Sequence, residues 1–252
     1  MNYKKMKVMT FSHQTALATI LLTSLPIAQA EVGNPFEFSA NVALTSDYVF
    51  RGISQTDEGF AIQGGFDIAH ETGFSMGTWA SNVKFLEDNT VNPEDRADIE
   101  IDLYVGYDGK WGDGGSYGIK AGNYSYPGAG SHLNYDYNEF NVHLGYATPE
   151  GIELGFAYDY APEVFGDVGA GHHYALTLGQ KMPSGLGFNV HVGQQSFSDN
   201  DKAGDDYIYY GASLSFPIAN FDGALSYSDT DLDNANTLNA DDRIFFTLSK
   251  SF

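Results

Sequence analysis

Residues 138–160 read NEFNVHLGYATPEGIELGFAYDY, and the order of apolar and polar side chains in this stretch decides the fold. Every second residue is apolar over 140–146 and again over 152–158. A period of two predicts β-strands with one apolar face, since successive side chains of a strand point to opposite sides. Residues 148–151 contain proline and glycine and predict a short turn. The stretch therefore predicts an antiparallel hairpin.

The same alternation recurs along most of the chain and predicts twelve strands, an even number. Two of them, over 74–83 and 117–126, have a weaker pattern, because the facing of the first is ambiguous and glycine dilutes the second. The well-marked alternating stretches are 38–44, 60–68, 99–107, 140–146, 152–158, 174–178, 186–192, 208–216, 221–227 and 244–248.

Composition and charge narrow the function. The 252-residue chain has 12 Lys and Arg against 33 Asp and Glu, a formal net charge of -21. Nucleic-acid phosphates would repel such a surface, so nucleic acid is not expected as a partner. With no cysteine, the chain has no disulfide and no thiolate metal site. Aromatic residues make up 15% of the chain, which favours an ordered protein.

The first thirty residues have the layout of a secretory signal peptide. Lysines within residues 1–7 precede an apolar stretch that ends at Ala28-Gln29-Ala30, a typical cleavage site. The apolar stretch is too short for a helix across about 30 Å of hydrocarbon. We therefore expect a signal peptide over 1–30, cleaved after Ala30, and a β-barrel domain over 31–252.

The predicted connections alternate between short turns and long polar loops. Short periplasmic turns and long extracellular loops are typical of outer-membrane barrels. We therefore expect an all-β, transmembrane antiparallel β-barrel of about twelve strands in the cell outer membrane, with a soluble exported sandwich as the alternative fold. Acidic residues outnumber basic ones in the long loops, which are 51–59, 84–97, 127–135, 161–171, 194–206 and 229–242.

The C-terminus adds a further signal. Ile244, Phe246 and Leu248 alternate towards the terminal Phe252. An aromatic residue at the end of the last strand resembles the signal that the outer-membrane assembly machinery reads. This machinery is therefore an expected partner through Phe252, together with outer-membrane lipid and lipopolysaccharide.

Several segments resemble one known family. The most specific is 45–56 (TSDYVFRGISQT), and 63–67 (QGGFD) and 77–83 (GTWASNV) fit the same pattern. On these residues the chain resembles the TorF-type porins of proteobacteria, over nearly all of the sequence after the signal peptide. The resemblance implies an outer-membrane barrel that acts as a porin. Phe60 departs from the family pattern, which has a proline there.

If the apolar positions face lipid, the residues between them face the barrel interior. A polar and mainly acidic interior suits a water-filled channel that prefers cations, and twelve strands leave a narrow path for small polar solutes. An interior closed by its own ion pairs, with Arg243 and Lys120 bridging carboxylates, is the alternative. The predicted pore-lining residues are Asp67, Asp98, Glu100, Asp102, Lys120, Glu139, His143, Glu153, His191 and Arg243.

Arg51 lies in the most distinctive motif, close in sequence to Asp47 and Asp57. We expect these three residues at the pore entrance. Arg51 either marks a constriction and holds the first loop inward, or forms an ion pair that only fixes the loop. The sequence favours neither reading.

No pattern nominates a metal site or a cofactor site, and no spacing of serine, histidine and acidic residues nominates a catalytic triad. His172 and His173 are adjacent and would point to opposite faces of a strand, so we expect solvated loop histidines. The acidic runs 199–201 and 229–233 lack the full ligand spacing of a calcium loop. The expected function is thus a non-enzymatic channel. The alternatives are a closed barrel whose loops bind divalent cations or an external partner, and an outer-membrane hydrolase.

Overall fold

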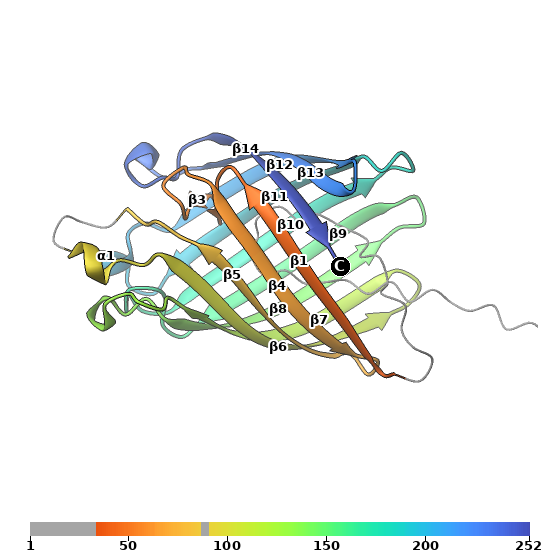
Figure 1. Ribbon diagram of the computed structural model, residues 1–252, viewed down its shortest axis with the longest axis horizontal. Coiled ribbons are helices and arrows are strands. Elements are labelled where there is room, and N and C mark those ends of the chain that lie inside the picture. Colours follow the sequence, from red (N-terminus) through yellow and green to blue (C-terminus); the bar gives the residue numbers. More distant parts are fainter. Residues whose placement is uncertain (1–33, 87–90) are drawn as a thin grey trace, which may run out of the picture.

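The computed structural model describes residues 34–86 and 91–252, and the predicted signal peptide lies outside these ranges. Twelve strands form one closed antiparallel barrel, which confirms the predicted fold class (Figure 1). The barrel strands are β1 (Phe36–Thr45), β4 (Ala61–His70), β5 (Phe74–Asn82), β6 (Ile99–Trp111), β7 (Gly115–Ser125), β8 (Tyr137–Ala147), β9 (Ile152–Ala161), β10 (Gly171–Lys181), β11 (Gly187–Phe197), β12 (Tyr207–Ile218), β13 (Phe221–Thr230) and β14 (Arg243–Ser251). Two short strands, β2 (Val49–Phe50) and β3 (Ile53–Ser54), form a separate sheet.

The first and last barrel strands close the barrel by pairing with each other. β1 pairs with β14 from Asn41 opposite Ser251 onwards, and its other edge pairs with β4. Phe252 extends this seam, because its N–H donates to the carbonyl of Ala40 at 2.9 Å. Closure pairs both edges of the barrel strands and so removes the unpaired edges that promote aggregation.

Side chains alternate between the outside and the interior. On β8, Phe140, Val142 and Leu144 are exposed, whereas Glu139 and Asn141, at the alternate positions, are buried in the interior. The other barrel strands follow the same rule, and the outer surface carries large exposed apolar side chains from every one of them. This outer surface has the apolar character of a barrel that faces lipid.

The two strands with the weakest sequence pattern are both present. β5 exposes Phe74 and Met76 and turns Trp79 inward, where it is 8% exposed. Its facing, ambiguous in the sequence, is therefore settled by the pairing with β4 and β6. β7 exposes Ile119, but the outward positions that follow, Ala121, Asn123 and Ser125, are small or polar, which accounts for the weak apolar pattern.

Long connections gather at one end of the barrel and short turns at the other (Figure 1). The turn between β6 and β7 consists of residues 112–114 only, because β6 continues to Trp111. Short helical turns occur in the long connections: η1 (Pro93–Asp95), η2 (Ser131–Leu133), α1 (Asn200–Ala203) and η3 (Ala235–Thr237). Within the described ranges, none of the helices has the length and apolar character needed to cross a membrane.

An aromatic cluster ties three of the long connections together. Tyr135 and Phe165 stack with their ring centroids 4.0 Å apart, and Phe85 meets both rings edge-on at 5.7 and 5.0 Å. Tyr126 also packs edge-on against Phe85 at 5.5 Å. These four rings hold the connections after β5, β7 and β9 against one another at the loop end of the barrel.

Candidate channel constriction

The first connection folds into the barrel instead of extending outside it. Residues 46–60, here called the inner hairpin, contain β2 and β3 and contact the inner wall. The tip is a two-residue turn at Arg51 and Gly52, with φ of +48° and +86°. Positive φ at both central residues is typical of a type I′ hairpin turn, and glycine adopts it without steric cost.

Arg51 joins the tip of the inner hairpin to three strands of the wall. Its Nη2 donates to Oε2 of Glu139 on β8 at 2.8 Å, and its Nη1 donates to Oε1 of Gln195 on β11 at 2.9 Å. Nη2 also lies 3.4 Å from Oδ2 of Asp159 on β9. Arg51 therefore ties the first loop to the inner wall through ion pairs with residues distant in sequence, and its role in a constriction stays a prediction.

The charge of Arg51 persists despite its burial. The side chains of Arg51 and Glu139 are only 8% and 6% exposed. Burial lowers the pKa of the guanidinium, but the opposing charges of Glu139 and Asp159 outweigh this effect and raise the pKa well above its ordinary value. A buried ion pair of this kind is costly to break, because one charge is left without a partner.

Aromatic contacts fix the first leg of the inner hairpin to the opposite part of the wall. The Tyr48 ring meets Trp79 of β5 edge-on with centroids 5.4 Å apart, and Phe50 lies 6.4 Å from Tyr124 of β7. The Tyr48 hydroxyl donates to Oε1 of Glu100 on β6 at 3.0 Å. With the contacts of Arg51, the inner hairpin touches walls on both sides of the barrel and narrows the interior.

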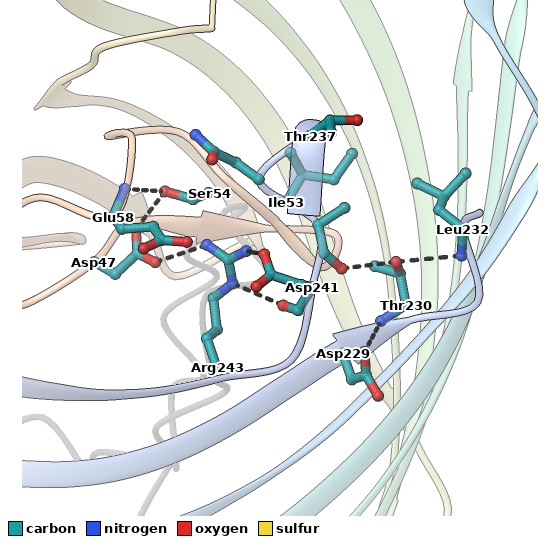
Figure 2. Close-up of polar contacts among 12 residues, drawn as sticks. Asp47, Ile53, Ser54, Glu58, Asp229, Thr230, Leu232, Thr237, Asp241 and Arg243 are labelled. Carbon is teal, nitrogen blue, oxygen red and sulfur yellow. Dashed lines mark hydrogen bonds and ion pairs between the residues drawn. The ribbon is translucent and has the colours of Figure 1, made fainter. Parts of the chain in front are cut away.

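Asp47 fastens the base of the inner hairpin (Figure 2). The hydroxyls of Ser54 and Thr56 donate to its Oδ1 at 2.5 and 3.0 Å. Nη1 of Arg243 on β14 donates to its Oδ2 at 3.0 Å, and Nη2 of Arg243 donates to Oδ1 of Asp241 at 2.8 Å. Arg243 thus bridges carboxylates, as the reading of an interior closed by ion pairs expected.

Asp57 links the inner hairpin to two other connections at the mouth. Lys84 Nζ donates to Oδ2 of Asp57, and Asn239 Nδ2 donates to Oδ1 at 3.3 Å. These two hydrogen bonds lower the pKa of Asp57. Lys84 is 71% exposed, so this pair contributes little to stability.

The sequence reasoning missed a histidine cluster in the wall. β10 begins at Gly171, before both histidines, so His173 points inward with 1% exposure. Its Nδ1 shares a hydrogen bond with Asp159, and its Nε2 one with the Tyr209 hydroxyl at 2.7 Å. The expectation of a solvated loop histidine is wrong for His173. The alternating pattern predicts a strand only from residue 174, whereas β10 begins at Gly171. Alternation extended back to His173 would place this side chain on the inner face.

Polar contacts continue along the inner wall towards the turn end. The Tyr104 hydroxyl donates to Oδ1 of Asp67 at 2.6 Å, and Lys120 Nζ lies 4.6 Å from the centroid of the Tyr104 ring. His143 Nε2 lies 3.1 Å from Oδ1 of Asp108. The predicted pore-lining residues Asp67, Lys120 and His143 are therefore on one part of the inner wall, in contact with other polar groups.

The remaining predicted lining residues divide into two groups. Glu100 and Asp102 are buried in the interior beside the inner hairpin, and Glu153 and His191 are partly buried on the inner face. Asp98 is different, because it precedes β6 and its side chain is exposed. The strand begins only at Ile99, so the alternation that placed Asp98 on the inner face does not extend to it. A role in a pore stays a prediction for the inner-face residues.

A serine in the barrel matches the letters of a hydrolase motif. Residues 114–118 read GGSYG, which fits G-x-S-x-G. That motif is functional where the serine sits on a sharp turn between a strand and a helix. Here Ser116 lies within β7 of a β-hairpin, so its backbone does not provide that geometry.

Together, these features define a closed twelve-stranded antiparallel barrel with an apolar exterior, a polar interior and a hairpin folded inside it. The chain belongs to the Gcw_chp family, described as bacterial proteins of unknown function, whose family model matches residues 29–252. No curated protein matches it in sequence. The resemblance to TorF-type porins stays a prediction.

Two solved porins share the architecture. The KdgM porin is 8% identical, with a TM-score of 0.58, and the match covers 85% of this chain and 99% of that one. The NanC porin is 10% identical, with a TM-score of 0.54, and the match covers 84% and 97%. KdgM has also been solved in complex with an oligogalacturonate. At these identities the likeness shows the fold.

Proposed function

We propose that this protein is an outer-membrane channel for small polar solutes, with a preference for cations. The observation that carries the proposal is the inner hairpin, which folds into an acidic barrel interior. The resemblance to TorF-type porins and the porin-like fold support the class of function. The enzymatic alternative has no comparable support, because Ser116 lies within a strand and His173 is hydrogen-bonded to Asp159 and Tyr209.

The charge of the constriction supports the cation preference. Carboxylates outnumber the guanidinium of Arg51 in the buried surroundings of the inner hairpin. These carboxylates belong to Glu100, Asp102, Glu139 and Asp159. Rings of carboxylates favour cations in other channels. The oligogalacturonate bound by KdgM is a polyanion, which the interior of this barrel would repel. We therefore propose a different class of solute for this protein.

The proposal includes where the protein resides and what it contacts. Its apolar exterior suits the outer membrane, which it would reach after cleavage of the signal peptide following Ala30. Lipid and lipopolysaccharide would surround the barrel and its acidic loops. Phe252, exposed at the end of the seam between β1 and β14, is proposed as the contact for the assembly machinery.

Single-channel recording tests the channel directly. The mature protein, refolded and inserted in a planar bilayer, is expected to give stable conductance steps, which the constriction keeps small. Under a salt gradient the reversal potential is expected to have the sign of cation preference, because carboxylates outnumber basic groups around the inner hairpin. A correctly folded barrel that stays silent would contradict the proposal and favour a closed barrel that binds its partner through the loops.

A lysine on the outer face tests membrane insertion independently of conductance. Leu176, in the middle of β10, is 56% exposed on the outside. We expect Leu176→Lys to destabilise the barrel in vesicles by about 2–4 kcal/mol, because the charge would face hydrocarbon. Urea unfolding followed by tryptophan fluorescence measures this change.

The matched control for this variant is the adjacent residue on the inner face. Thr177 is partly buried and follows Leu176 on the same strand. Thr177→Lys is expected to cost much less, because its charge would face the polar interior. Equal destabilisation by the two variants would contradict a lipid-facing exterior.

A further inference from the structure

Asp102 is a buried carboxylate without a hydrogen-bond donor on one oxygen. It lies on the inner face of β6 and is 7% exposed, and its Oδ1 is buried with no hydrogen-bond partner among the described residues. Glu100, two residues away on the same face, is well satisfied. It accepts hydrogen bonds from the Tyr48 and Tyr126 hydroxyls, both at 3.0 Å. Asp102 therefore differs from its neighbour because its Oδ1 accepts no hydrogen bond, although the positive charge of Lys120 acts on the carboxylate.

Two aromatic side chains flank Asp102 on the wall. In the register of the barrel, Asp102 lies directly opposite Trp79 on β5 and directly opposite Tyr124 on β7. Side chains in such positions have Cβ atoms about 4.5–5.5 Å apart. Trp79 and Tyr124 are themselves held by Tyr48 and Phe50 of the inner hairpin. The carboxylate thus sits between two fixed aromatic rings beside the constriction.

This setting is suited to a singly charged organic cation. A buried carboxylate oxygen without a hydrogen bond is costly, and a bound cation with an N–H donor or a proton would stabilise it. The faces of Trp and Tyr attract ammonium groups, most strongly where water is excluded. The same wall already holds one ammonium against an aromatic face, since Lys120 Nζ lies 4.6 Å from the centroid of the Tyr104 ring.

We propose that Asp102, Trp79 and Tyr124 form a binding site for small alkylammonium ions in the barrel interior. The carboxylate supplies the charge, and the Trp79 ring and the side of the Tyr124 ring away from its stacking partner Tyr137 supply the aromatic surface for the alkyl part of the ion. The inference deepens the proposed function by naming a solute class. Binding can be measured at equilibrium in detergent, so the site and the channel can fail separately.

Trp79 provides a reporter inside the site. The chain has two tryptophans, and the other, Trp111, is 52% exposed at the turn end of β6. In the Trp111→Phe protein, all tryptophan fluorescence therefore comes from Trp79. Methylammonium chloride is titrated in place of sodium chloride at constant total salt, with the folded barrel verified by circular dichroism. We expect a saturable change in fluorescence.

Two added substitutions locate the binding. Asp102→Asn in the Trp111→Phe background is expected to weaken methylammonium binding by at least about tenfold, because the charge is lost while the shape is kept. The matched control is Asp222→Asn, which removes an inner-face carboxylate on β13, across the barrel. This variant is expected to bind like the Trp111→Phe protein.

Three outcomes would overturn the site. The first is a folded Trp111→Phe protein whose fluorescence does not respond to methylammonium, the result expected if Asp102 simply carries a proton. The second is an equal saturable response when potassium chloride replaces sodium chloride, which would remove the preference for an organic cation. The third is equal binding by the Asp102→Asn and Asp222→Asn variants. The first two need only the Trp111→Phe protein, so a variant that fails to fold does not block the test.

Methylammonium binding by a protein that is silent in bilayers would leave the site intact and overturn the channel.

Discussion

Arg51→Met is expected to release the inner hairpin from the wall and to increase single-channel conductance several-fold. Arg51 makes both hydrogen bonds from the hairpin tip to β8 and β11, and methionine keeps an unbranched side chain that lacks the guanidinium and its charge. Loss of the guanidinium leaves Glu139 and Asp159 buried without their cation, which should cost about 3–5 kcal/mol of folding stability. The uncompensated carboxylates should also move the reversal potential further towards cation preference. Bilayer recordings and urea unfolding measure these effects.

Two further variants separate the contributions of Arg51. Arg51→Lys keeps the charge but lacks the planar fork that reaches two acceptors, so an intermediate conductance is expected. Lys202→Met removes one positive charge from a residue that is 61% exposed in a different connection, and should change neither conductance nor stability. If Arg51→Met conducts like the unaltered protein, the inner hairpin does not form the constriction.

The barrel itself could be predicted from the sequence because one local rule governs it. An exterior of apolar side chains and a polar interior force a period of two on every strand, as in residues 140–146, so the strands are visible one by one. The rule fails where a strand has not begun, as at Asp98, and where it begins earlier than expected, as at His173. Both errors concern strand ends, where alternation gives no boundary.

The constriction could not be predicted because its contacts join distant parts of the chain. Arg51 and Gln195 are 144 residues apart in sequence, and Arg51 and Glu139 are 88 apart. A polar loop has no periodic pattern that distinguishes folding inward from extending into water. The motif 45–56 distinguishes this segment from the other loops, and Arg51-Gly52 is compatible with a tight turn. Neither feature indicates which barrel strands the hairpin contacts.

Gly52→Ala is expected to push the inner hairpin away from the wall by adding a single methyl group. A Cβ at this position would lie 2.5 Å from Cγ2 of Thr230 and 2.8 Å from Cβ of Tyr209, both closer than van der Waals contact allows. The backbone at Gly52 also has a φ of +86°, which alanine adopts only with strain. We expect faster hydrogen exchange over residues 46–60, higher conductance and lower stability. Exchange measured by mass spectrometry does not depend on whether the protein conducts.

Gly204→Ala separates the backbone strain from the clash. Gly204 has nearly the same φ, +89°, in the connection before β12, and a Cβ there would have no atom within 4 Å. Both variants should therefore lose about 1–3 kcal/mol through a positive φ that alanine adopts only with strain, the ψ of Gly204 being −169°, and only Gly52→Ala should add the clash and disturb the inner hairpin. The difference between them measures how tightly the hairpin tip packs against β12 and β13. Equal stability and unchanged exchange over 46–60 in both variants would mean that the tip does not rest on this wall, and the constriction would then have to lie elsewhere in the barrel.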